Sequence, residues 1–112
     1  MDVSKQTQEK INQISLIEEN LRNVFAKKHA YQSEQLEINN ALKELEKAEG
    51  QVYKIAGPVM IISKKEDLQV DLKEKKELTE VKLQSVENQE TKLKEKAQSL
   101  QEEVLKEMEG KK

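Results

Sequence analysis

The chain has 112 residues, enough for one domain, but only 35% of them are hydrophobic and 3% aromatic. This composition is too poor in apolar residues for the core of an ordinary globular domain. Charged residues make up 38%, and 20 Lys and Arg nearly balance 22 Asp and Glu to give a net charge of −2. Dense, balanced charge favours a long solvated helix over a disordered chain, and it leaves no uncompensated basic patch for DNA, RNA or an anionic membrane.

The sequence contains no Cys, which excludes disulfides, thiolate nucleophiles and thiolate metal sites. The first ten residues lack the apolar run of a signal peptide. The longest apolar run, residues 59–62, is far shorter than the ~20 residues of a membrane span. We therefore expect a soluble, cytoplasmic protein.

Residues 5–49 are predicted to form the first of two coiled-coil helices. No Gly or Pro interrupts this stretch, and Gly50 suits the left-handed position that follows a helix. Alternating steps of three and four residues define a seam in which eight of ten positions are apolar or aromatic. Its members are Ile14, Ile17, Leu21, Val24, Lys28, Tyr31, Gln35, Ile38, Leu42 and Leu45.

Residues 50–63 are rich in β-branched and aromatic residues around Gly57-Pro58, which predicts a β-hairpin. Gly57 suits a type II′ turn, although a slightly longer loop is equally allowed. An isolated hairpin is marginal in water, and this one has open edges and an apolar surface. We expect it to assemble with other chains rather than to fold back onto its own helices. The assembly residues would be Val52, Tyr53, Ile55, Val59, Met60, Ile61 and Ile62.

Residues 64–109 are predicted to form the second helix, opened by Ser63 as its N-cap. Ser63 and Glu66 have the capping-box spacing, Glu66 and Asp67 suit the positive end of the helix dipole, and Gly110 suits a left-handed C-cap. The same stepping defines a second seam in which seven of ten positions are apolar. Its members are Leu72, Lys76, Thr79, Leu83, Val86, Glu90, Leu93, Ala97, Leu100 and Val104.

Two helices of similar length joined by a short connector are expected to fold back on one another. The predicted fold is therefore mainly α: a long antiparallel two-helix coiled coil with one β-hairpin at the helix connection. If Leu45 faces Leu72, Lys28 falls close to Glu90, and this pair of opposite charges would specify the register. A register shifted by one heptad is also compatible with the sequence.

The order helix, hairpin, helix resembles the β class of prefoldin subunits. The resemblance is most specific in VYKIAGPVMI, residues 52–61, and extends to DLKEKKE and VENQETKLKEK in the second helix. It implies a hexamer of two α-class and four β-class subunits, whose hairpins join into two small intersubunit β-barrels. It also implies an ATP-independent chaperone, in which the distal ends of the coiled coils hold unfolded proteins and pass them to a group II chaperonin.

The end of the helix pair that carries both chain termini holds more apolar side chains than one seam can bury. They are Val3, Ile11, Ile14, Leu16, Val104, Leu105 and Met108. Leu16 and Leu105 lie off the seam, where they would contact an unfolded client without demanding a particular sequence, and Met108 would add an adaptable side chain. Alternatively, Leu16, Leu105 and Met108 broaden the seam.

The sequence carries no pattern typical of an active site or a cofactor site. His29 is expected on the solvated side of the first helix without a catalytic or metal partner, and there is no Gly-rich phosphate loop. We therefore predict a non-enzymatic chaperone subunit without cofactors. A passive coiled-coil scaffold or tether is the alternative, and a nucleic-acid or membrane binder is a third class that the near-neutral charge disfavours.

Overall fold

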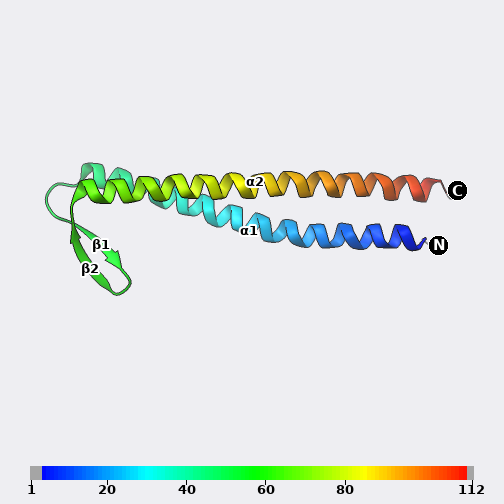
Figure 1. Cartoon of the computed structure of the whole chain (residues 1–112), viewed down its shortest axis with the longest axis horizontal. Helices are drawn as coiled ribbons and strands as arrows, with labels where there is room; N and C mark the ends of the chain where they lie inside the picture. Colours follow the sequence, from blue (N-terminus) through cyan, green and yellow to red (C-terminus); the bar gives the residue numbers. More distant parts are fainter. Residues whose placement is uncertain (1–3, 111–112) are drawn as a thin grey trace. The chain divides into compact units, whose positions relative to one another are not determined.

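The computed structural model describes residues 4–110, and these form two long helices joined by a β-hairpin. In chain order the elements are α1 (Lys5–Lys47), β1 (Val52–Ala56), β2 (Val59–Ser63) and α2 (Lys65–Glu109) (Figure 1). The predicted fold class, mainly α with one hairpin between two long helices, is confirmed. The chain divides into two compact units. We call Met1–Lys28 with Ser85–Lys112 the tip unit, and His29–Gln84 the hairpin unit.

Helix α1 begins after an N-cap residue, Ser4, that was not predicted. The Ser4 hydroxyl accepts a hydrogen bond from the N–H of Thr7 at 3.1 Å, and the Ser4 carbonyl accepts one from the N–H of Gln8 at 2.9 Å. The hydroxyl thereby satisfies one of the amides that a helix leaves open at its start. Without Gly or Pro, the helix then continues to Lys47.

Helix α1 ends at Lys47 rather than at residue 49. Gly50 has a φ of +87°, so it adopts the predicted left-handed conformation, but it lies beyond the helix end instead of capping it directly. Lys65 bonds the open carbonyls instead. Its ammonium donates to the carbonyls of Glu46 and Ala48 at 3.0 and 3.3 Å. A residue in the first turn of α2 therefore caps the end of α1.

Helix α2 begins at Lys65, and the predicted capping box at Ser63 is wrong. Ser63 is the last residue of β2, where it pairs with Val52. The carbonyl of Lys64 accepts the first helical hydrogen bond, from the N–H of Leu68 at 3.1 Å. Strand pairing therefore takes up the residue that the local pattern assigned to the cap.

The two ends of α2 differ in how well they were predicted. Glu66 and Asp67 lie in the first turn, as expected for side chains that stabilise the positive end of the helix dipole. At the other end, the N–H of Gly110 donates to the carbonyl of Lys106 at 2.9 Å, which continues the α-helical pattern. Gly110 does not have a positive φ, so the predicted left-handed C-cap is wrong.

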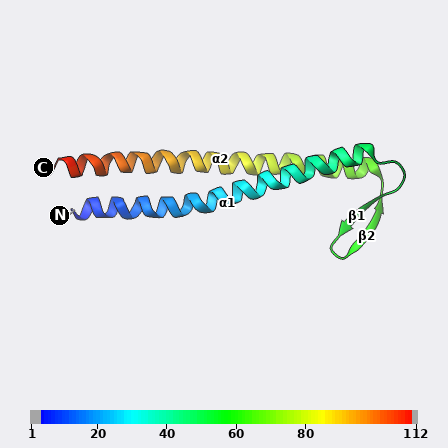
Figure 2. The same cartoon turned by 180° about the vertical axis from the view of Figure 1, so that it is seen from behind.

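In the tip unit, the helices pack antiparallel along the predicted seam. As residue numbers rise on α1 their partners fall on α2, since Thr7 bonds Glu107 and Lys28 bonds Glu90. Both views place the first turn of α1 and the last turn of α2 at the same end of the pair (Figures 1 and 2). Among the described residues of this unit, the buried side chains are Thr7, Ile17, Val24, Val86, Ala97 and Val104.

In the hairpin unit, the buried side chains also lie on the predicted seam. Ile38, Leu45 and Thr79 are all less than a tenth exposed. The ammonium of Lys82 lies 6.0 Å from the ring centroid of Tyr31, which is a cation–π contact between the helices. Leu36, only two residues from Ile38, is 62% exposed. The buried seam is therefore narrow, and side chains just beside it face solvent.

The predicted pairing of Lys28 with Glu90 is confirmed, and it excludes a register shifted by one heptad in the tip unit. Lys28 Nζ donates to Glu90 Oε1 at 3.2 Å, and Lys94 Nζ lies 3.6 Å from the same oxygen. The Glu90 side chain is only 12% exposed. The hydrogen bond from Lys28 lowers the pKa of Glu90, although desolvation of the carboxylate opposes this shift.

Ile38→Ala should lower the free energy of unfolding by about 2 to 5 kcal/mol, because truncation of a buried side chain loses apolar burial and leaves a cavity. Leu36→Ala is the matched control and should change it by no more than about 0.5 kcal/mol, as is usual for a surface site. Urea unfolding followed by circular dichroism measures both values. Equal losses from the two substitutions would contradict the assigned seam.

Glu90→Gln should destabilise the chain at neutral pH but not in acid. Because the pKa of Glu90 is lowered in the folded state, its stabilising contribution is present above the unfolded value of 4.5 and is lost as the pH falls through the folded pKa. Unfolding free energies of wild type and variant, measured at pH 7 and at about pH 3, test this. Glu95→Gln removes an exposed carboxylate from the same helix and should have little effect at either pH. If Glu90→Gln still lowers the free energy of unfolding in acid, the charge of the Glu90 carboxylate does not have the assigned role.

Candidate assembly and client-binding surfaces

The hairpin is closed by the two-residue turn Gly57-Pro58. Strand pairing continues up to Ala56 and Val59, so only the two intervening residues lie in the loop. Gly57 has a φ of +61°, and the Pro58 ring restricts its own φ to negative values. This combination is that of a type II′ turn. The predicted turn is confirmed, and the longer loop is excluded.

One face of the hairpin, called here the apolar face, carries three aliphatic side chains and one aromatic side chain. Opposed residues on antiparallel strands point to the same face, and two of these pairs are Tyr53 with Ile62 and Ile55 with Met60. Their exposure ranges from 47% for Tyr53 to 73% for Ile55. The opposite face is mixed and carries Val52, Lys54, Ala56, Val59, Ile61 and Ser63. The structure therefore divides the predicted assembly residues between two faces, with four of the seven on the apolar face.

No other described strand lies beside the outer edges of the hairpin. Among residues 4–110, β1 and β2 pair only with each other, as a two-stranded sheet. Val52 is half-buried, and the other six predicted assembly residues are exposed. An edge with free backbone donors and acceptors, next to an apolar face, is suited to pairing with a strand from another chain.

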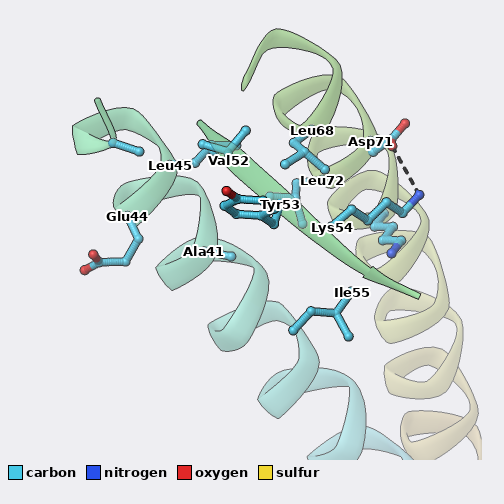
Figure 3. A pocket seen from close by; sticks show the side chains of 12 residues that line it. Ala41, Glu44, Leu45, Val52, Tyr53, Lys54, Ile55, Leu68, Asp71 and Leu72 are labelled. Carbon is cyan, nitrogen blue, oxygen red and sulfur yellow. Dashed lines mark ion pairs between the residues drawn. The ribbon is translucent and has the colours of Figure 1, made fainter. Parts of the chain in front are cut away.

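The hairpin unit contains an open cavity of about 490 Å³ between β1 and both helices (Figure 3). Lys54 reaches from β1 to α2, where its Nζ lies 3.6 Å from Asp71 Oδ2. Both side chains are nearly half exposed, so the pair orients the strand while adding little stability. Apolar side chains line much of the cavity, among them Ala41, Leu45, Leu68 and Leu72. The chain's own helices therefore cover β1 only in part.

The structure separates the predicted client-binding residues into exposed and seam positions. Val104 is 9% exposed and Ile14 is half-buried, so both belong to the seam. Val3 lies outside the described residues. The exposed members are Ile11 at 36%, Leu16 at 59%, Leu105 at 60% and Met108 at 40%.

Three of the exposed residues share one flank of the seam. Lys10 and Glu107 are half-buried and extend the seam spacing by one step beyond Ile14 and Val104, and Ile11 and Met108 directly follow them. In an antiparallel pair, residues that follow the seam in this way meet on the same side. Leu105 follows Val104 and projects toward that side as well, whereas Leu16 precedes Ile17 and lies on the other.

A polar cluster closes the seam at the tip. Thr7, which is 1% exposed, donates its hydroxyl to Glu107 Oε2, and Lys10 Nζ donates to Glu107 Oε1. Lys10 Nζ also lies 3.5 Å from Glu103 Oε2, and the hydroxyls of Ser4 and Thr7 are 2.7 Å apart. The hydrogen bond to Glu107 raises the pKa of Lys10, although desolvation opposes the change.

This cluster was not predicted, although its spacing was visible in the sequence. The predicted seam ends at Ile14 and Val104. Two further steps back from Ile14 reach Lys10 and Thr7, and one step on from Val104 reaches Glu107. These positions follow the coiled-coil spacing. They were not predicted because the seam was recognised by its apolar side chains, and these residues are polar.

The part of the chain that the structure describes gives no indication of metal binding. Residues 4–110 contain no group of three or more His, Cys, Asp or Glu side chains that could hold a metal ion. His29 is exposed. None of the helices in this range is long and apolar enough to cross a membrane.

Comparison with known proteins identifies the family. The model of a family described as prefoldin subunit matches residues 8–111. The chain belongs to the prefoldin subunit family. The crystal structure of the prefoldin beta subunit from Thermococcus strain KS-1 matches with a TM-score of 0.87 and 32% identity, over 92% of each chain.

Curated relatives support the same assignment at the level of the β class. The prefoldin subunit beta of Pyrobaculum islandicum is 33% identical over 103 residues, which cover 90% of this chain and 82% of the relative. The prefoldin subunit beta of Methanospirillum hungatei is 29% identical over 113 residues, covering 99% and 94%. The resemblance predicted from the hairpin and helix motifs is therefore confirmed.

Family membership establishes the general role of the chain. Prefoldin subunits are non-enzymatic chaperone subunits, and prefoldin β subunits assemble into hetero-oligomers with other prefoldin subunits. The chain is a prefoldin chaperone subunit, and the predicted absence of enzymatic activity agrees with the family.

Changing Ile61 and Ile62 together to Lys should prevent hetero-oligomer formation. The two residues lie on opposite faces of the hairpin, so the double change puts a charge on each face. Burying either unpaired charge against another subunit is costly. Native mass spectrometry of the chain mixed with an α-class prefoldin subunit measures the result.

The matched control for the hairpin variant is Leu78→Lys with Val81→Lys. These residues are 55% and 65% exposed on α2, so the control adds the same charge to apolar surface outside the hairpin. Assembly should survive in the control. A stable complex formed by the Ile61 and Ile62 double variant would remove the hairpin from the interface.

Proposed function

We propose that this prefoldin subunit joins a cytoplasmic hexamer of two α-class and four β-class subunits through its hairpin. The apolar face formed by Tyr53, Ile55, Met60 and Ile62 supports this assignment, together with the two open strand edges. Closing the hairpins of several subunits into β-barrels would pair these edges and cover one face of each hairpin. The half-covered cavity next to β1 leaves space for side chains of neighbouring subunits.

The tip unit would hold unfolded proteins. Its exposed apolar residues are Ile11, Leu105 and Met108 on one flank and Leu16 on the other. Unfolded chains expose apolar side chains that folded proteins bury, and contacts of this kind require no particular sequence. Met108 adds a flexible, polarisable side chain that adapts to different partners. These four exposed residues are the observation that carries the proposed client binding.

A held client would then pass to a group II chaperonin without ATP. The sequence has no Gly-rich loop for nucleotide phosphates. Each large apolar side chain contributes at most about 1.5 to 3 kcal/mol when it is fully buried, so a client held by a few partial contacts can leave without an energy source. Release of a client without ATP is also what the resemblance to β-class prefoldin subunits implies.

The decisive test uses the assembled hexamer and a chemically denatured client protein. Leu16→Ser, Leu105→Ser and Met108→Ser together should leave the hexamer intact and weaken suppression of client aggregation by several-fold. These changes remove apolar surface from the tip but leave the seam and the hairpin unaltered. Light scattering after dilution from denaturant measures suppression, and native mass spectrometry measures assembly.

The matched control replaces three exposed apolar residues of the hairpin unit, Leu36, Leu78 and Val81, by Ser. It removes comparable apolar surface away from the tip, and suppression should stay at the wild-type level. If the tip variant suppresses aggregation as well as wild type does, these residues do not bind clients. A wild-type hexamer without any effect on client aggregation would favour the passive scaffold.

A further inference from the structure

The polar cluster at the tip ties the two helix ends together through one carboxylate. Glu107 on α2 receives a donor from α1 on each of its oxygens, the Thr7 hydroxyl on Oε2 and the Lys10 ammonium on Oε1. Glu103 adds a second carboxylate, 3.5 Å from Lys10 Nζ. Each of these three interactions between the helices involves at least one charged group.

The neighbouring layers have the opposite character. Moving inward from the cluster, Ile14 is half-buried, while Val104 and Ile17 are 9% and 5% exposed. Beside the cluster, the exposed Ile11 and Met108 each directly follow one of its residues. The cluster therefore has two kinds of apolar neighbour. Those further inward are buried or half-buried in the seam, and those beside it are exposed to solvent.

Opening the polar layer costs less than opening an apolar one. The side chains of Lys10, Glu107 and Glu103 are 28%, 30% and 51% exposed, so water already reaches them. When the helix ends separate, hydrogen bonds to water replace those within the protein, so the net cost in free energy is small. Separating an apolar layer costs more, because Ile and Val side chains that become exposed to water lose the hydrophobic stabilisation of burial. The end of the seam is thus built to open more readily than its interior.

We propose that Thr7, Lys10 and Glu107 form a releasable clasp that controls access to apolar residues of the seam. With the clasp closed, Ile14 and Val104 stay between the helices. With the clasp open, the helix ends separate, and these two side chains join the exposed flank in contacting a client. The client part of this inference rests on the proposed function, whereas the opening of the clasp does not.

Distance measurements test the clasp without any client. The chain has no Cys, so Glu9→Cys and Glu102→Cys introduce unique sites for spin labels at exposed positions on the two helices of the tip unit. Hexamers assembled mostly from unlabelled subunits then report the distance within one subunit by pulsed EPR. The label positions avoid the clasp residues.

Two clasp variants should change the width of this distance distribution in opposite directions. Glu107→Lys sets a second ammonium against Lys10, and it should lengthen and broaden the distance distribution. Combined Thr7→Val, Lys10→Leu and Glu107→Leu replace the clasp by an apolar layer and should narrow the distribution. Glu95→Lys makes the same charge change at an exposed position of α2 and should leave it unaltered. An unchanged distribution in Glu107→Lys would overturn the proposal.

Added salt tests the clasp in the wild-type sequence, because it weakens the ion pairs without any substitution in the clasp. Between about 0.1 M and about 1 M salt the screening length falls from ~10 Å to ~3 Å, which weakens partly exposed ion pairs. The wild-type distribution should broaden toward that of Glu107→Lys, while the apolar-layer variant should not respond. An equal response from wild type and the apolar-layer variant would count against the clasp.

Client protection tests whether the opening matters for function. The apolar-layer variant should suppress aggregation several-fold less well than wild type, and Glu107→Lys should suppress it at least as well. Equal suppression by all three would overturn the control of client access, even if the distances respond. A wild-type hexamer that protects no client would instead count against the proposed function, and the distance measurement would still decide whether the clasp opens.

Discussion

Two helices bury side chains along one seam only, and most features of this structure follow from that constraint. In the described residues the buried side chains lie on the seam spacing, whereas Phe25 and Leu36 are more than 60% exposed beside it. Residues 4–110 form no second core in which further apolar side chains could be buried. Groups of exposed apolar side chains, such as those of the hairpin and the tip, are therefore surfaces available to other molecules.

Polar layers within the seam give it a unique alignment. Apolar layers tolerate a shift by one heptad, because Leu and Ile pack similarly against one another. The Lys28–Glu90 hydrogen bond does not tolerate such a shift, because the shift would leave a partly buried carboxylate without its partner on the other helix. The cluster around Glu107 has the same requirement at the tip, where Thr7 and Lys10 must both face one carboxylate. Such layers contribute less stability than apolar ones, and in return they determine which residues meet.

The features predicted correctly from the sequence are those that a repeating pattern specifies. Every seam position predicted from the spacing is buried or half-buried, and the turn at Gly57 follows from a conformation that other residues rarely adopt. Features that depend on competition between neighbouring elements were not predicted. Ser63 suits both a helix cap and a strand, and pairing with Val52 placed it in the strand. At the candidate site, the spacing correctly placed Val104 in the seam and Leu105 off it, whereas the polar residue types of Thr7, Lys10 and Glu107 concealed the last layer of the seam.

The two candidate surfaces differ because their backbones differ. The outer edges of β1 and β2 present backbone donors and acceptors that pair with no other strand among residues 4–110, so a partner that pairs with them would have to supply a strand in a matching register. At the tip, the backbone groups of α1 and α2 are already bonded within the helices, and only side chains remain to make contacts. A strand edge therefore selects a partner by its backbone geometry, whereas a helix flank accepts any apolar chain that reaches it. The proposed assembly with defined neighbours and the proposed tolerant binding of clients would thus each follow from the secondary structure that carries it.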